Sequence, residues 1–250
     1  YLFLLTGGSF ILASCNDFLD REPLDSVTPD NFFFTENDLA AYAVKHYNFT
    51  THEGFNAGIW KNDNATDNQA ATDYDKKWIP GQWKVPEAYD NPASNDPWYF
   101  STIREANYFL ETVVPRFEKG EIEGSETNIK HYIGEMYFLR AKNYLSKLET
   151  FGDFPIIKNT LPDESESLIQ ASKRAPRYKV AHFILEDLDQ AISLLTNNIS
   201  GGKNRITKNA ALLLKSRAAL FEASWLTYHK GTALVPGGPG WPGKAEDIAD

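Results

Sequence analysis

The chain has 250 residues, of which 42% are hydrophobic, 14% aromatic and 24% charged, and it contains one cysteine. A single cysteine excludes a fold held together by internal disulfides, and the aromatic content excludes an intrinsically disordered chain. The 34 acidic and 25 basic residues give a formal net charge of −9, which disfavours binding to nucleic acid, because that binding depends on clustered Lys and Arg. The fold must therefore rest on a hydrophobic core.

The N-terminal residues 1–14 contain no charged side chain, and they are too few to cross a bilayer, which takes about 20 apolar residues. They are typical of the apolar part of a signal peptide, without the basic segment that normally precedes it, so we expect the sequence to begin inside the signal. The run Leu12–Cys15 resembles a bacterial lipoprotein box. We therefore expect lipid attachment at Cys15, the first residue of the mature protein; the alternative is an incidental cysteine.

Five helices are predicted in chain order from capping residues and from apolar residues at helical spacing. They begin after Thr35, at Trp98, near Asn128, at Pro176 and after Thr207. We expect the second helix to end at Pro115, the third at the Phe151–Gly152–Asp153 stop, and the fifth to carry the apolar stripe Ala210, Leu213, Leu214, Arg217, Phe221 and Ser224. With no convincing alternating strand, this pattern predicts an all-α fold of tetratricopeptide-like helical hairpins with long inserted loops.

Three of the predicted apolar stripes contain one charged residue each: Arg140, Asp187 and Arg217. A buried charge without a partner costs several kcal/mol, so such residues are tolerated when they are paired. We expect all three to be structural buried charges that fix the helix register, with Asp187 accepting hydrogen bonds from one of the arginines.

Several motifs, in this order along the chain, resemble the SusD/RagB family of outer-membrane lipoproteins of Bacteroidota. They are SCNDFLD at 14–20, the helix with Trp98, Ile103, Arg104 and Asn107, EMYFLRAKNY at 135–144, FGDFP at 151–155, RITK at 205–208 followed by Ala211, and KSRAAL at 215–220. The resemblance spans nearly all of the chain after Cys15.

The resemblance implies a non-enzymatic lipoprotein exposed on the outer membrane, which captures oligosaccharides for a SusC-type TonB-dependent transporter. Family members are longer than 250 residues, so we expect residues 15–250 to be the N-terminal helical-repeat region, incomplete at its C-terminus. Peptide capture, as in the RagB branch, is an alternative ligand class. A helical-repeat scaffold that binds only proteins is an alternative of another class.

The segment between Thr50 and Pro97 is loop-like, and it is rich in aromatic, amide and carboxylate side chains. Glycan sites combine exposed aromatic rings with such hydrogen-bonding groups. The candidate ligand-binding residues are therefore Trp60, Asp63, Asn64, Tyr74, Trp78, Trp83 and Tyr89. The alternative is that these aromatic residues cover the helical core.

Catalytic and metal-binding patterns are weak in this sequence. No Gly-x-Ser-x-Gly nucleophile motif is present, and the acidic residues are explained by solvated helix faces, so we expect no enzyme activity. The five histidines lack ligand spacing, and the oxygen-rich run 62–68 lacks the glycine and glutamate of an EF-hand. We expect no cofactor, with calcium at residues 62–68 as the alternative.

Overall fold

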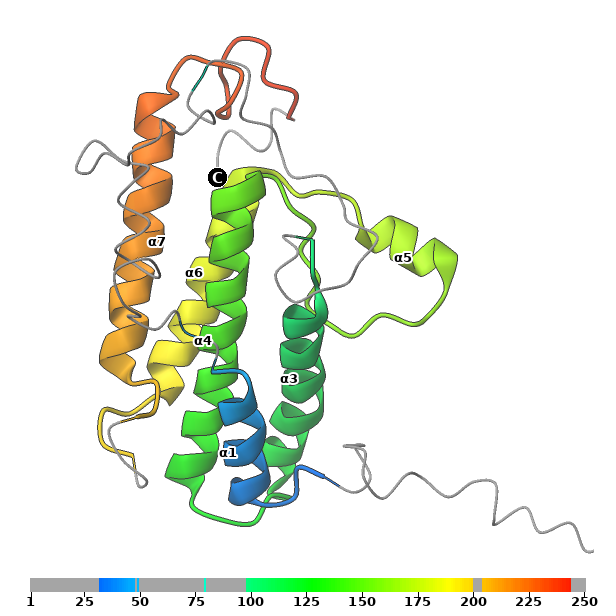
Figure 1. Ribbon diagram of the computed structural model, residues 1–250, viewed down its shortest axis with the longest axis vertical. Coiled ribbons are helices and arrows are strands. Elements are labelled where there is room, and N and C mark those ends of the chain that lie inside the picture. Colours follow the sequence, from blue (N-terminus) through cyan, green and yellow to red (C-terminus); the bar gives the residue numbers. More distant parts are fainter. Residues whose placement is uncertain (1–31, 48, 50–78, 80–97, 200–203, 244–250) are drawn as a thin grey trace, which may run out of the picture. The chain divides into compact units, whose positions relative to one another are not determined.

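The computed structural model describes residues 32–47, 49, 79, 98–199 and 204–243. In this part every regular element is a helix: α1 (Glu36–Lys45), α3 (Ser101–Lys119), α4 (Glu126–Phe151), α5 (Ser165–Ala171), α6 (Arg177–Leu194) and α7 (Lys208–Tyr228) (Figure 1). All six helices belong to one compact unit that begins at Phe33. The all-α prediction is confirmed.

The predicted N-caps of α1 and α7 are present. The Thr35 hydroxyl accepts a hydrogen bond from the Asp38 backbone N–H, and the Asp38 carboxylate accepts one from the Thr35 N–H at 3.0 Å, which forms a complete capping box. The Thr207 hydroxyl accepts from the Ala210 N–H at 3.2 Å. These local bonds satisfy backbone groups that a helix end would otherwise leave without partners.

Three helix boundaries differ from the sequence predictions, and the structure contains one further helix. The α3 helix begins at Ser101 and not at Trp98, and it continues through Pro115 to Lys119. Gly120 follows it with a φ of 71°, the left-handed conformation that glycine favours. Pro115 therefore costs α3 one backbone hydrogen bond without ending it. Pro176 is the residue before α6 rather than its first residue, and the short helix α5, which has no buried residue, was not predicted.

The α4 helix lies in the middle of the bundle and contacts α1, α3, α6 and α7 (Figure 1). It is buried on all sides rather than along one stripe, with Met136, Tyr144 and Leu148 almost fully enclosed. Sequential neighbours α3 and α4 pack together, as do α6 and α7. This arrangement agrees with the predicted helical hairpins.

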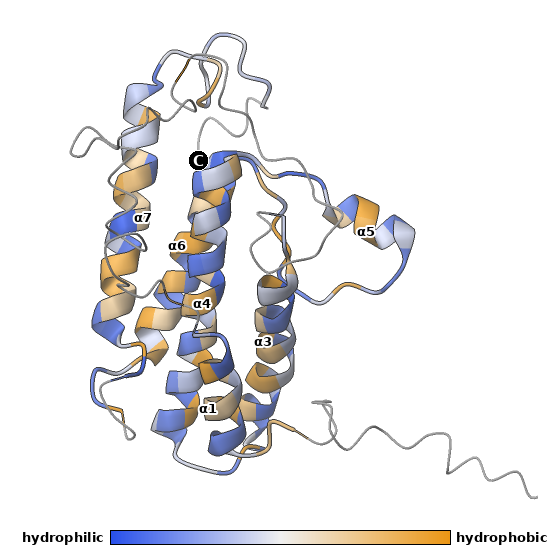
Figure 2. Cartoon of the chain, in the orientation of Figure 1, coloured by the Kyte–Doolittle hydropathy of each residue, from blue (hydrophilic) through white to orange (hydrophobic). Residues whose placement is uncertain are grey.

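The predicted apolar stripe of α7 is wrong. The helix buries Ala211, Ala218 and Glu222, whereas Leu213 is 73% exposed and the Arg217 side chain is 71% exposed. Apolar residues lie along the whole of α7 (Figure 2), so their spacing did not identify one face. Arg217 is consequently a surface residue 3.5 Å from Glu149, and its assignment as a buried charge is corrected.

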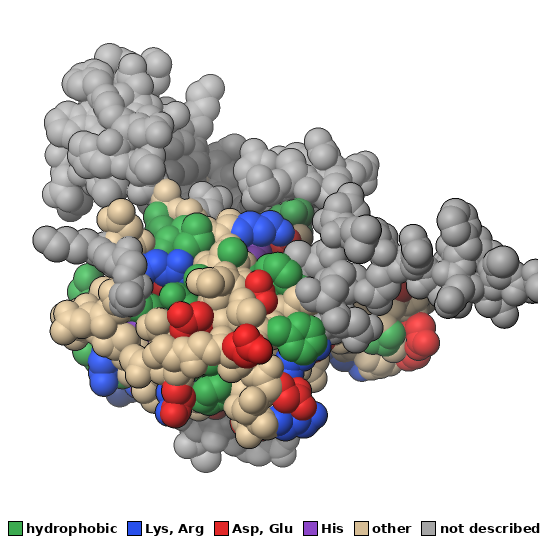
Figure 3. Space-filling model, turned by 90° about the horizontal axis from the view of Figure 1, so that it is seen from below, with side chains coloured by type: hydrophobic (Ala, Val, Ile, Leu, Met, Phe, Trp, Pro, Cys, Tyr) green, Lys and Arg blue, Asp and Glu red, His purple; other side chains and the backbone are tan. Residues whose placement is uncertain are grey.

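Among the described residues, no helix is both long and apolar enough to cross a membrane. Acidic and basic side chains are interspersed on the described part of the face seen in Figure 3. This mixture is typical of a solvated surface and does not form the continuous basic patch that nucleic-acid binding requires.

Candidate functional site

The predicted lipidation and ligand-binding residues lie outside the part of the chain that the structure describes. They are Cys15, Trp60, Asp63, Asn64, Tyr74, Trp78, Trp83 and Tyr89, and the alternative calcium run at 62–68 lies there as well. Within the described residues, no group of three or more His, Cys, Asp or Glu side chains could hold a metal ion. The candidate site is therefore built from the described helices and their connections.

Arg140 on α4 and Asp187 on α6 form a buried ion pair with two hydrogen bonds. Arg140 Nε donates to Asp187 Oδ2 and Arg140 Nη2 donates to Asp187 Oδ1, both at 2.7 Å. The two residues are 6% and 3% exposed. Burial raises the pKa of the Asp187 carboxyl above its ordinary value, although the hydrogen bonds from Arg140 oppose this shift. The pair links α4 to α6 as the sequence predicted.

The same arginine anchors the extended segment that follows α4. Arg140 Nη1 donates to the side-chain oxygen of the fully buried Asn107 at 2.8 Å, and the Asn107 amide donates to the Ile157 carbonyl at 2.8 Å. The Tyr144 hydroxyl accepts from the Ile157 N–H and donates to the Ile157 carbonyl. Side chains from α3 and α4 therefore fix the backbone near residue 157 without any strand partner.

This segment forms one wall of a cavity of about 540 Å³, which we name the α3–α5 pocket. The start of α3, the segment around residues 155–161 and α5 contribute its lining, which consists of Trp98, Phe100, Ile103, Arg104, Asn107, Pro155, Ile157, Asn159, Leu161, Leu168, Ser172 and Arg174. Trp98 is the first described residue after the aromatic-rich segment 50–97. The lining of the pocket therefore begins at the residue that follows the predicted ligand-binding segment in the sequence.

Aromatic stacking holds the rings of the pocket in place. The Trp98 ring lies 4.1 Å from the Phe151 ring, centroid to centroid, and Phe100 stacks on Phe154 at 5.1 Å with 13° between the planes. Both Trp98 and Phe100 remain half-buried, whereas Phe154 is fully buried. The pocket thus presents partly accessible rings on a rigid apolar base.

The charged residues that the structure describes at this pocket are both arginines. Arg104 and Arg174 are exposed, and no carboxylate is among the lining residues. The Arg174 guanidinium lies 5.0 Å from the centre of the Trp98 ring, and no described carboxylate forms an ion pair with either arginine. Chemically, two available guanidinium groups beside aromatic rings and an amide can bind hydroxyl or carboxylate oxygens of a ring-shaped ligand.

A second buried network, centred on Glu135 of α4, was not predicted from the sequence. Glu135 is fully buried and accepts from the Tyr47 hydroxyl at 2.7 Å, from Arg205 Nε at 2.9 Å and from Arg205 Nη2. His131 Nδ1 accepts from the Thr196 N–H at 3.2 Å, so the other ring nitrogen, 3.1 Å from Glu135, carries the proton that it donates. The network joins α1, α4 and the residues before α7.

The sequence analysis does not identify four charged residues that the structure buries or partly buries: Glu135, Arg177, Arg205 and Glu222. Glu135 lies on α4, which is buried on all sides, so one apolar stripe does not reveal it. Glu222 directly follows Phe221, and the stripe predicted through Phe221 is not the buried face of α7. Arg177 and Arg205 lie at helix starts, where an arginine is normally exposed. The α3–α5 pocket gave no local signal at all, because its walls come from segments far apart in the sequence.

Comparison with known proteins identifies relatives of this chain. A family model described as "Starch-binding associating with outer membrane" matches residues 17–220. SusD-like protein P2 of Formosa agariphila is 25% identical over 186 residues, which cover 72% of this chain and 35% of that protein. SusD-like protein P38 of the same bacterium is 27% identical over 201 residues, which cover 78% of this chain and 37% of that protein.

A crystal structure of a SusD-like protein from Bacteroides fragilis has a similar fold, with a TM-score of 0.59 and 25% identity. The match covers 82% of this chain and 38% of that structure. The chain therefore spans little more than a third of the length of these relatives, and the description of the matching family names binding rather than a reaction. The family model and these relatives, together with the helical fold, show that the chain belongs to the SusD-like family.

Proposed function

We propose that this chain is part of a cell-surface protein that captures oligosaccharides and delivers them to a SusC-type TonB-dependent transporter in the outer membrane. Starch binding and outer-membrane association in the family description support this proposal. The observation that carries it is the α3–α5 pocket, because aromatic rings, an amide and two guanidinium groups converge there, and neither guanidinium has a carboxylate partner among the described residues.

The size and chemistry of the pocket suit a sugar ring. A cavity of about 540 Å³ is within the range of small-molecule sites, roughly 300–1,000 Å³. The C–H face of a sugar packs against aromatic and aliphatic side chains such as Trp98 and Leu168, while its hydroxyls bond to Asn159, Ser172 or an arginine. The pair Arg104 and Arg174 favours sugars that also carry a carboxylate or sulfate group.

The aromatic residues of the preceding segment extend this proposed surface. We propose that the ligand also contacts Trp60, Asp63, Asn64, Tyr74, Trp78, Trp83 and Tyr89, which precede Trp98 in the sequence. A calcium ion at residues 62–68 remains the alternative to a cofactor-free site. Repeating the ligand titrations in EDTA tests it, because a calcium-dependent site would lose affinity.

A fluorescence titration tests the proposed ligand class. Oligosaccharides from xylan, starch, mannan, alginate and pectin are added to the chain while tryptophan emission is followed, with a mixture of peptides as the competing class. A saturable change with at least one glycan is expected, because Trp98 lines the pocket. A response to peptides alone would contradict glycan capture and favour the RagB-like alternative.

We propose that lipid on Cys15 anchors the protein to the membrane. In cells that express the full-length protein, the unaltered protein is expected in the outer-membrane fraction. The Cys15→Ser variant is expected in the aqueous fraction, because stable anchoring requires acyl chains on the protein. An unchanged distribution of the Cys15→Ser variant would contradict lipid anchoring.

A protein-binding scaffold is the second candidate, because α7 exposes large apolar side chains. Leu212, Leu213 and Leu220 are 47%, 73% and 68% exposed. A scaffold would bind protein partners through such a surface and would bind no glycan in the fluorescence titration. The same experiment therefore separates the two candidates.

A further inference from the structure

The buried ion pair between Arg177 of α6 and Glu222 of α7 differs from the other two described here. Arg140 and Arg205 each use two nitrogens on both oxygens of their carboxylate partner. Arg177 uses Nε alone, which donates to Glu222 Oε2 at 2.8 Å. Glu222 Oε1 and Arg177 Nη2 are buried, and neither has a hydrogen-bond partner in the described structure. Glu222 Oε1 can therefore accept one further hydrogen bond, and Arg177 Nη2 can donate one.

Leaving these two atoms without partners is unfavourable. Glu222 is 7% exposed and Arg177 is 9% exposed, so solvent replaces few of the missing hydrogen bonds. Burial raises the pKa of the Glu222 carboxyl and lowers that of the Arg177 guanidinium, and the mutual attraction of the two groups opposes both shifts. A bound group that both donates and accepts hydrogen bonds would complete this pair.

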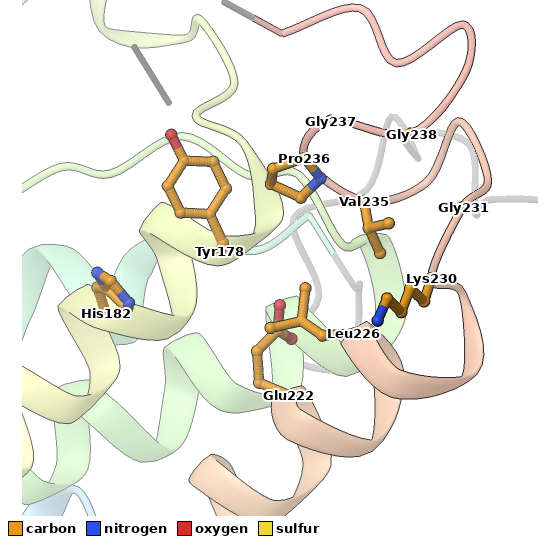
Figure 4. A pocket seen from close by; sticks show the side chains of 10 residues that line it. All are labelled: Tyr178, His182, Glu222, Leu226, Lys230, Gly231, Val235, Pro236, Gly237 and Gly238. Atoms are coloured by element: carbon orange, nitrogen blue, oxygen red, sulfur yellow. The ribbon is translucent and has the colours of Figure 1, made fainter. Parts of the chain in front are cut away.

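Glu222 lines a cavity of about 500 Å³, which we name the α6–α7 pocket (Figure 4). Its walls are Tyr178, His182, Glu222, Leu226, Lys230, Gly231, Val235, Pro236, Gly237 and Gly238. A smaller hollow of about 190 Å³ shares Tyr178, Glu222, Leu226 and Pro236 with it and adds Arg177 and Trp241. Both residues of the ion pair are thus wall residues of this double cavity.

The loop after α7 closes one side of the α6–α7 pocket with a defined conformation. A Cβ atom added at Gly238 would lie 1.7 Å from the Thr232 carbonyl oxygen, so only glycine fits there. The Gly238 N–H donates to the Val235 carbonyl at 3.1 Å, and Val235 is itself buried. The wall is therefore a tight turn that the sequence specifies through its glycines.

The volume and the polarity of this cavity define a class of ligand. A single water molecule occupies roughly 30 Å³, so the cavity that Glu222 lines holds far more than one bridging water. The charges of Arg177 and Glu222 cancel, which gives no preference for a charged ligand at the base. Glu222 Oε1, an acceptor, and Arg177 Nη2, a donor, belong to the same ion pair and match two neighbouring hydroxyl groups, one of which donates while the other accepts. Trp241, Tyr178 and Leu226 supply apolar surface for the carbon skeleton.

We propose that the α6–α7 pocket is a second binding site, which takes a neutral ligand with vicinal hydroxyl groups, of the size of one sugar ring. Glu222 Oε1 accepts from one hydroxyl of the ligand, Arg177 Nη2 donates to its neighbour, and Trp241 packs against the ring. The smaller hollow shares Arg174 with the α3–α5 pocket, whereas Arg104 lines the α3–α5 pocket alone and so distinguishes the two sites.

Saturation-transfer NMR with single-ring probes tests the second site. The probes are the methyl glycosides of glucose, galactose, mannose and xylose, added to the purified chain. Saturation transfer to at least one probe is expected. The Glu222→Gln variant should weaken glycoside binding roughly tenfold or more, because the negative charge of the acceptor is lost and one of the two carboxylate oxygens becomes an amide donor. No transfer to any probe would overturn the proposal.

Three further variants keep the test independent of folding and of the first site. Trp241→Ala removes a half-buried aromatic ring from the loop and leaves both residues of the ion pair in place. This variant should also bind the glycosides more weakly. Leu213→Ala, on the exposed side of α7, and Arg104→Gln, in the α3–α5 pocket, should leave glycoside binding unchanged. Equal binding by wild type and Trp241→Ala would contradict the site, as would a crystal soaked with the best probe that shows only ordered water at Glu222.

Discussion

Individual buried charges hold this molecule together by joining helices that are distant in the sequence. Arg140 with Asp187, Arg177 with Glu222 and Arg205 with Glu135 each link two segments at least 45 residues apart. The pair Arg140–Asp187 could be predicted, because each residue lies on an apolar stripe. Glu135 could not, because α4 is buried on all sides and not along one stripe, and Glu222 could not, because the predicted stripe of α7 lies one residue away from the buried face.

Removing one partner of the Arg140–Asp187 pair should be strongly destabilising. The Asp187→Ala variant leaves a buried guanidinium without its carboxylate, which costs about 3–5 kcal/mol out of a typical total of 5–15 kcal/mol. Thermal melting followed by circular dichroism measures the loss. Arg217→Ala is the matched control, because Arg217 is exposed and should change stability by no more than about 0.5 kcal/mol. Equal melting of wild type and Asp187→Ala would refute the structural role.

His46, at the end of α1, should make stability depend on pH. Its side chain is 7% exposed, with Nδ1 3.4 Å from a Glu105 oxygen and Nε2 buried without a partner among the described residues. Burial lowers the pKa of His46 below its ordinary value of 6.5, although Glu105 opposes the shift. The unfolded chain therefore takes up the proton first as the pH falls, and the folded state loses stability below about pH 6.5.

Urea unfolding at pH 7.5, 6.5 and 5.5 measures this dependence. The contribution of one histidine has a slope of at most about 1.4 kcal/mol per pH unit. The His46→Gln variant should have a shallower slope than wild type, because it cannot be protonated. Identical slopes for the two proteins would show that another group causes any loss of stability in acid.

The helices themselves followed closely from the sequence wherever a specific residue defines a helix end. Thr35 and Thr207 are caps in the structure, and Gly152 follows the last residue of α4. The faces of the helices were less predictable. The α7 helix carries leucines on several sides, and only its contact with α6 and α4 determines that Ala211 and Ala218 are the buried residues.

Two substitutions on α7 test which face packs inward. Ala218 is 3% exposed, so Ala218→Leu should overfill the contact and cost about 1–3 kcal/mol. Leu213→Ala, on the exposed side, should change the free energy of unfolding by no more than about 0.5 kcal/mol. Denaturant titrations of the two variants give the comparison. The reverse order of effects would restore the stripe predicted from the sequence.

The molecule as a whole combines an acidic composition with a local excess of arginine at one pocket. The formal net charge is −9, yet Arg104 and Arg174 line the α3–α5 pocket without a lining carboxylate. Composition and motifs predicted the all-α fold and the family, because these depend on local patterns. The pocket could not be predicted, since α3, the segment near Ile157 and α5 meet only in the folded chain, through Asn107 and Arg140.

Isothermal titration calorimetry of wild type and Arg104→Gln, with the glycan that gives the largest fluorescence response, tests glycan capture most directly. Arg217→Gln, an equally charged change at an exposed site outside the pocket, is the matched control. We predict saturable binding by wild type and Arg217→Gln, and roughly tenfold weaker binding by Arg104→Gln, because a hydrogen bond from a charged donor is lost. Binding of the same strength by all three proteins would contradict the α3–α5 pocket as the site, and no binding of any glycan by wild type would contradict glycan capture itself.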